Sequence, residues 1–165
     1  MSDKVSHNTR ADLAPEREEM TATSTPEQLE QVKNRAKSVG DMFYSRVRET
    51  GHREAFRFPD ANEDWHSVTW AQAGVIVSEI AAGLVSLGIQ AEERVAIAAG
   101  TRIEWIYADL GINSAGAATT TVYPSTVAAD TAYIPADPVR RIVFAEDDVQ
   151  LAKLKETQAD VRSVI

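Results

Sequence analysis

The sequence predicts an α/β fold with a partial, doubly wound and mainly parallel sheet. Val95, Ile97 and their neighbours form a short apolar run, which is typical of a strand buried on both faces. Apolar side chains then recur at helical spacing over residues 103–110, with Ile103, Ile106, Tyr107 and Leu110 on one stripe. Residues 119–123 are again β-branched and aromatic. Two strands joined through a helix of this length form a right-handed parallel crossover.

The N-terminal region predicts a polar tail followed by one long helix. Residues 1–24 are rich in charged and hydroxyl side chains, so we expect a disordered tail there and a single domain over residues 25–165. Thr25, Pro26 and Gln28 are typical of a capped helix start, and one apolar stripe continues to about Glu49.

The next segment predicts a hairpin and a second helix. Residues 55–58 and 65–69 are two short extended stretches around a Pro-Asp-Ala-Asn turn. Thr69 then caps a helix with Gln72 in the capping-box position, and Gly88 ends it. The expected buried face consists of Ala73, Val77, Ile80, Leu84 and Leu87.

The segment after the crossover has the spacing of a helix, but it contains a proline. Pro135 lies within residues 125–136, where it removes a backbone hydrogen bond and clashes with the preceding turn. Pro138 also biases Asp137 away from helical angles. We therefore expect this helix to kink or end at about Ile134.

The C-terminal segment predicts another strand, helix and strand. Residues 141–145 form the first strand, and Asp147 or Asp148 begins the helix. Residues 161–165 form the last strand, and they are also the last residues of the sequence. Either this is an edge strand or the chain is cut inside a larger sheet, and we favour the cut. An uncovered edge of this kind invites self-association.

Composition excludes several classes of function. The formal net charge of −8 argues against a nucleic-acid surface. The absence of cysteine excludes disulfides, thiolate metal sites and a cysteine nucleophile. No apolar run is long enough to cross a bilayer, and the N-terminus lacks the apolar core of a signal peptide. We expect a cytoplasmic protein, with peripheral membrane association left open.

Three polar stretches could bind ligands, and each has a simpler interpretation. The loop at residues 99–102 joins a strand to a helix, but one glycine makes neither a dinucleotide fingerprint nor a Walker loop. The hydroxyl-rich residues 119–126 also suit an ordinary strand and loop. The acidic residues 146–148 could ligate a cation, but they more simply complement a helix N-terminus. We favour the simpler interpretation in each case.

No catalytic constellation is present in the sequence. His7, His52 and His66 have no zinc-ligand spacing and no acidic partner at a telling offset. No serine lies in a nucleophile elbow, and no lysine lies in a glycine-rich loop. We therefore assign no catalytic residue and no metal ligand.

The order of several short motifs closely resembles the N-terminal portion of long-chain fatty acyl-CoA synthetases. These are AMP-forming members of the adenylate-forming enzyme superfamily. The resemblance covers about residues 25–165. The motifs that carry it lie at residues 67–70, 83–89, 93–97, 101–105, 108–110, 115–117, 122–126 and 132–134.

The resemblance implies fatty acid activation. A fatty acid carboxylate attacks the α-phosphate of Mg-ATP, and coenzyme A then displaces AMP from the acyl-adenylate. In the family, the Pro-Lys-Gly loop, the adenine-binding core and the C-terminal lid lie later in the chain. We therefore expect a truncated N-terminal subdomain, inactive alone and binding no cofactor by itself.

The resemblance also suggests roles for a few residues. Tyr123, Pro124, Ser125 and Thr126 are candidates for a wall of the acyl and CoA channel. Glu104 and Trp105 match the family pattern, and we expect structural roles for both. Trp105 should pack against the domain, and Glu104 should pair with a cation such as Arg102.

Two other functions compete with the enzyme interpretation. One is a non-catalytic module that binds acyl-CoA or a partner protein through an apolar surface. The other is an unrelated small nucleotide-binding α/β domain, which the lack of a phosphate loop makes the weakest of the three.

Overall fold

The structure is a computed structural model that describes residues 24–123, 125, 140–156 and 163–165. The chain divides into two compact units, Met1–Arg35 and Ala36–Ile165, which we describe separately. The first contains helix α1 (Pro26–Lys33). Its N-terminus has the predicted capping box, because the Gln28 N–H donates to Thr25 Oγ1 at 3.2 Å and the Thr25 N–H donates to Gln28 Oε1 at 2.8 Å.

The prediction of one long helix up to Glu49 is wrong. Helix α1 ends at Lys33, and a separate helix α2 (Val39–Thr50) opens the second unit. Ser38 is extended and its Oγ accepts the Asp41 N–H at 3.0 Å. The Asp41 carboxylate accepts the Lys37 N–H at 3.0 Å in return. This side-chain cap begins a new helix although the apolar spacing continues across the break.

The predicted hairpin is confirmed. Strands β1 (Glu54–Pro59) and β2 (Trp65–Thr69) pair antiparallel. In the turn, the Asp60 carboxylate accepts two backbone N–H groups at 2.8 and 3.0 Å and lies 2.9 Å from His66 Nε2. His66 therefore has an acidic partner, contrary to our expectation, because the turn brings together two residues that are six apart.

Helix α3 (Trp70–Ser86) forms as predicted. The Gln72 N–H donates to Thr69 Oγ1, and the Gln72 side chain accepts the Thr69 N–H, so the capping box is complete. Gly88 follows the helix with a φ of +83°, a conformation that favours glycine. Of the expected buried face, Ala73, Val77 and Leu84 are fully buried, and Ile80 and Leu87 are partly buried.

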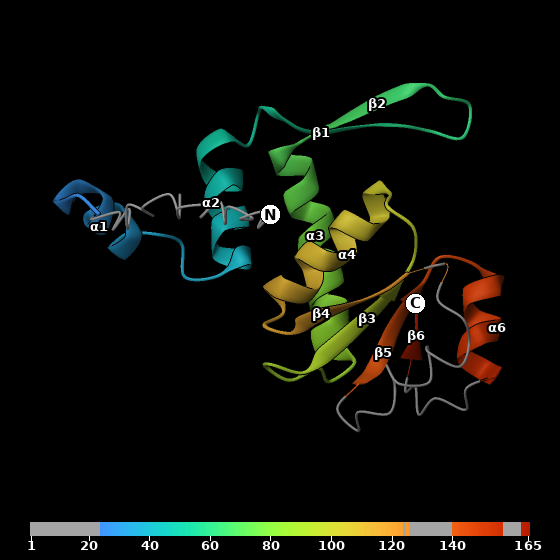
Figure 1. Ribbon diagram of the computed structural model, residues 1–165. Coiled ribbons are helices and arrows are strands. Elements are labelled where there is room, and N and C mark those ends of the chain that lie inside the picture. The colour runs from blue at the N-terminus through green and yellow to red at the C-terminus, as the bar shows by residue number, and fades with distance from the viewer. Residues whose placement is uncertain (1–23, 124, 126–139, 157–162) are drawn as a thin grey trace, which may run out of the picture. The chain divides into compact units, whose positions relative to one another are not determined.

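The sheet is parallel, with strand order β4-β3-β5-β6. Strands β3 (Arg94–Ala98) and β4 (Ala118–Val122) are joined through helix α4 (Ile103–Ser114), which confirms the predicted crossover (Figure 1). Strands β5 (Arg140–Ala145) and β6 (Ser163–Val164) confirm the later strands. Helix α6 (Asp148–Glu156) lies between them in sequence. The helix predicted over residues 125–136 lies almost wholly outside the described residues.

Both faces of the sheet are covered, as a doubly wound fold requires. From β3, Val95 and Ile97 pack with side chains of α3 and α4, including Leu84 and Ile112. The alternate residues Ala96 and Ala98 pack in a second cluster with Leu154 of α6. Side chains alternate along a strand, so this division places α3 and α4 over one face and α6 over the other. The predicted burial of β3 on both faces is confirmed.

The buried face of α4 differs from the predicted stripe. Of the four expected residues only Tyr107 is fully buried, and the other fully buried positions are Ala108, Gly111 and Ile112. Helix α4 contacts α3, β3 and β4 together. Small side chains therefore lie where the backbones approach closely. A Cβ on Gly111 would come within 2.9 Å of Ile80 Cβ and closer still to its Cγ2.

Candidate functional site

Two loops meet at the carboxyl ends of neighbouring parallel strands. The first joins β3 to α4 and contains Gly100 and Arg102, and the second joins β5 to α6 and contains Glu146. The Glu146 N–H donates to the Ala98 carbonyl oxygen at 3.1 Å, which extends the pairing of β3 and β5 into these loops. Open parallel sheets commonly bind ligands at this edge.

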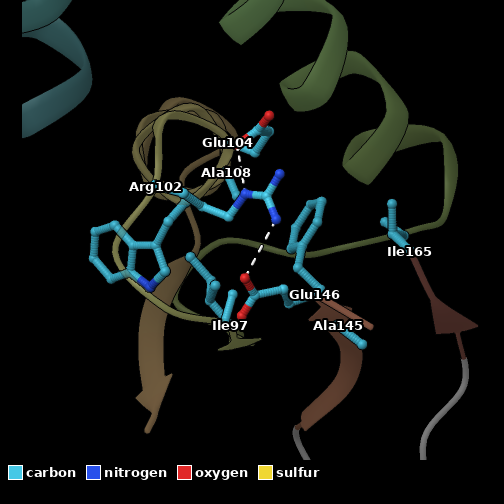
Figure 2. A pocket seen from close by; sticks show the side chains of 10 residues that line it. Ile97, Arg102, Glu104, Ala108, Ala145, Glu146 and Ile165 are labelled. Carbon is cyan, nitrogen blue, oxygen red and sulfur yellow. Dashed lines mark hydrogen bonds and ion pairs between the residues drawn. The ribbon is translucent and has the colours of Figure 1, made fainter. Parts of the chain in front are cut away.

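A network of charged side chains ties the two loops together. Glu146 Oε2 accepts the Gly100 N–H at 2.8 Å, and Glu146 Oε1 accepts Arg102 Nη1 at 3.3 Å. Arg102 Nε donates to Glu104 Oε2 at 2.7 Å. Figure 2 shows the Arg102 guanidinium between the two carboxylates. The expected pairing of Glu104 with Arg102 is confirmed.

The network favours the simpler interpretation of the loop at residues 99–102, whereas of the acidic residues Asp147 caps the following helix and Glu146 bonds the other loop. The Gly100 amide, which could have faced a phosphate, is bonded to the protein's own Glu146 carboxylate. Asp147 Oδ1 accepts the Gln150 N–H at 2.9 Å, so it caps α6. In the part of the chain that the structure describes, no group of three histidine or acidic side chains could hold a metal ion.

Sequence reasoning missed Glu146 as a member of this network. It lies 44 and 46 residues from its two partners, so no local motif signals the contact. One signal was present, because Glu146 directly follows a predicted strand. An acidic residue at the end of one parallel strand can reach the loop that follows its neighbour.

The guanidinium changes the titration of its partners. The hydrogen bond from Arg102 is the main cause that lowers the pKa of Glu104, with a smaller Coulombic contribution. The pKa of Arg102 is raised, first by Glu104 and then by Glu146. Because the folded pKa of Glu104 is lowered, its stabilising contribution is present above the ordinary glutamate pKa. The contribution is lost as the pH falls through the lowered value.

We expect Arg102→Gln to raise the pKa of Glu104 toward its ordinary value. The substitution removes the hydrogen bond and the positive charge that favour the carboxylate. Carbon-detected NMR titration of the glutamate carboxyls in both proteins measures the change. Arg46→Gln, in an exposed ion pair on α2, is the matched control and should leave Glu104 unchanged. An unaltered Glu104 titration in Arg102→Gln contradicts the assignment of the cause.

An apolar cavity of about 250 Å³ lies beside the network. Trp105 forms part of its wall and also packs against the core, which confirms the expected packing of this residue. The charged residues at the cavity are Arg102, Glu104 and Glu146, and the other lining residues are Ile97, Ala99, Trp105, Ala108, Phe144, Ala145 and Ile165.

The channel-wall candidates lie just beyond β4. The register pairs Ala98 with Val122, so Tyr123 follows β4 at the same edge of the sheet as the network. Tyr123 is 69% exposed and Ser125 is also exposed, and neither lines the apolar cavity. Pro124 and Thr126 lie outside the described residues. Their role as a channel wall stays a prediction.

Comparison with known proteins decides the family. Residues 43–165 match the model of the AMP-binding enzyme family. The chain belongs to this family. It is 35% identical over 97 residues to the long-chain-fatty-acid–CoA ligase FadD15 of Mycobacterium tuberculosis, and the same holds for FadD15 of Mycobacterium bovis. The match covers 59% of this chain and 16% of each relative. These findings confirm the resemblance found in the sequence.

Solved structures of related ligases share the fold. A Mycobacterium tuberculosis fatty acyl CoA synthetase matches with a TM-score of 0.68 and 20% identity, over 78% of this chain and 26% of that chain. The anthranilate CoA ligase AuaEII matches with a TM-score of 0.68 and 16% identity, over 78% of this chain and 24% of that one. The matched part of this chain therefore corresponds to about a quarter of either structure.

No helix within the described residues is both long enough and apolar enough to cross a bilayer.

Proposed function

We propose that this chain takes part in fatty acid activation, in which ATP-dependent formation of an acyl-adenylate is followed by formation of acyl-CoA. The observation that carries the proposal is the 35% identity to long-chain-fatty-acid–CoA ligases, within an AMP-binding family match over residues 43–165. The complete enzyme would use a fatty acid, ATP, Mg²⁺ and coenzyme A. The ligase activity of these relatives also makes the non-catalytic module the less favoured alternative.

In this proposal, residues 25–165 form part of the structural framework of the enzyme. Residues 1–24 precede this framework as a polar tail. Tyr123, Pro124, Ser125 and Thr126 form one wall of the acyl and CoA channel in this proposal. The chemistry needs further polypeptide, so the 165 residues alone are inactive. A cytoplasmic location and self-association through the C-terminal strand edge belong to the same proposal.

A chimeric ligase tests the proposed function. Residues 43–165 would replace the matching part of Mycobacterium tuberculosis FadD15, and formation of palmitoyl-CoA from palmitate, ATP and coenzyme A would be measured. We expect activity in the chimera and none in a FadD15 variant from which the matching part is deleted. A folded chimera that activates no fatty acid of any length would contradict the proposal.

A further inference from the structure

A hydroxyl group is buried without a hydrogen-bond partner next to the β1–β2 hairpin. Tyr107 on α4 is only 7% exposed, and within the described residues its Oη neither donates nor accepts a hydrogen bond. Burial is the main cause that raises the pKa of this phenol, and the charge of Glu104 is the second. A buried donor of this kind has lost its hydrogen bonds to water and has gained none in the protein. The closed structure is therefore destabilised at Tyr107.

The hairpin is the element over Tyr107 that can move with the smallest loss of buried surface. The ring of Phe56 in β1 meets the ring of Tyr107 edge to face, with the ring centroids 6.1 Å apart. Helices α2 and α3 contribute fully buried residues to the same apolar cluster, namely Phe43, Ala73 and Val77. In contrast, no residue of β1 or β2 is fully buried. Moving the hairpin therefore exposes less apolar surface than moving either helix would.

The hairpin is joined to the helices at its base and shares no pairing with the main sheet. It forms a separate two-stranded sheet. At the base, the Trp70 N–H donates to the Arg53 carbonyl oxygen at 3.0 Å, and the Ala71 N–H donates to the Gly51 carbonyl oxygen at 2.9 Å. A two-stranded hairpin is only marginally stable by itself in water. Amide hydrogens between β1 and β2 therefore exchange with solvent once the hairpin leaves the helices.

The hairpin also forms one wall of a hollow at the carboxyl edge of the main sheet. The hollow has a volume of about 500 Å³, with residues 58–61 of the hairpin on one side. Residues 101–104, which follow β3, and Glu146, which follows β5, line the rest of it. Open parallel sheets commonly bind ligands at this edge. Opening of the hairpin separates the two walls and uncovers residues 101–104.

We propose that the β1–β2 hairpin is a lid that opens while the four-stranded sheet and its helices stay folded, and that this opening hydrates the hydroxyl group of Tyr107. Closing returns Phe56 to the apolar cluster but removes water from the phenol, so the two effects oppose each other. The lid is therefore held less firmly than its apolar contacts alone would hold it. The inference does not depend on the acyl-CoA chemistry proposed above, and its tests involve no enzyme activity.

Hydrogen exchange in Tyr107→Phe tests the lid on the 165-residue chain. The substitution removes the hydroxyl group and keeps the ring, and NMR follows the exchange of individual amides. In the unaltered protein, amides paired between β1 and β2 should exchange faster than those paired between β3 and β5, because the lid opens without global unfolding. In Tyr107→Phe the hairpin amides should exchange about fivefold more slowly or slower still, since closing no longer buries an unpaired donor.

Tyr44→Phe is the matched control for this exchange experiment. Tyr44 packs against the same cluster, but its hydroxyl oxygen lies 2.8 Å from Ser78 Oγ and so has a hydrogen-bond partner. Its removal should not slow exchange in the hairpin. Two results would overturn the proposal: equal protection of the hairpin and the main sheet in the unaltered protein, or hairpin exchange that Tyr107→Phe slows no more than Tyr44→Phe does.

A single thiol tests whether the same motion uncovers the hollow. The chain has no cysteine, so Ile103→Cys introduces a unique reactive group. Ile103 packs against the cluster around Tyr107 and also lines the hollow. Modification by a bulky thiol reagent should be slowed by added Tyr107→Phe, by about the same factor as hairpin exchange. Circular dichroism shows that both variants are folded. Equally fast modification with and without Tyr107→Phe would contradict uncovering of the hollow by the lid.

Discussion

Replacing Gly111 with alanine is expected to destabilise the protein by about 1–3 kcal/mol. Gly111 is buried where α4 crosses α3, and a Cβ there would overlap the side chain of Ile80. The Cβ of Ile80 is fixed to the α3 backbone, so the side chain cannot simply rotate away. Relief requires the two helices to separate, which loosens the core on that face of the sheet. Urea denaturation monitored by circular dichroism measures the change in the free energy of unfolding.

Gly83 provides a matched control for this substitution. It lies within helix α3, and a Cβ there would meet no other atom within 4 Å. Gly83→Ala should therefore leave stability unchanged or raise it by up to about 1 kcal/mol, because alanine is the better helix former. Equal effects at the two glycines would contradict the close approach of α3 and α4.

Local sequence signals predicted those elements whose boundaries depend on a few adjacent residues. Both capping boxes formed because their four residues interact among themselves. Gly88 ends its helix as predicted, with a positive φ that glycine adopts readily. Strand β3 was predictable because a run of apolar residues without polar alternation suits a strand covered on both faces.

The errors arose where tertiary context or a competing local signal decided the structure. The apolar stripe predicted one helix to Glu49, but the cap at Ser38 begins a new one. On α4, periodicity identified a helix but not its most buried face, because α3 approaches so closely at Gly111 that a Cβ there would overlap Ile80. Residue spacing carries no information about how closely a second helix approaches.

The same difference between local and long-range contacts decided which parts of the site could be predicted. Arg102 and Glu104 are two residues apart, so their pairing could be expected from the sequence. The contribution of Glu146 could not, since it depends on β3 and β5 becoming neighbours in the sheet. The family was recognisable because several weak motifs occur in the right order, although no single one of them carries chemistry.

The proposed function includes the expectation that the isolated chain is inactive, because its sequence contains no recognised catalytic motif. Adenylate formation must hold a carboxylate and a triphosphate together and stabilise the charge that develops on transfer. None of the lysines in the sequence lies in a glycine-rich loop. The guanidinium of Arg102, at the carboxyl edge of the sheet, already donates to two carboxylates. We therefore expect these residues to act as a scaffold in the proposed reaction.

Fatty-acid-dependent ATP–pyrophosphate exchange by purified Met1–Ile165 tests this scaffold role most directly. The chain should show cooperative unfolding, which establishes that it is folded. The rate of ATP–pyrophosphate exchange with palmitate, ATP and Mg²⁺ should equal the rate of the enzyme-free blank. Full-length Mycobacterium tuberculosis FadD15 in the same assay is the positive control. Exchange above the blank that depends on both palmitate and the folded chain would show that these 165 residues contain the chemistry themselves, which contradicts a role as scaffold alone.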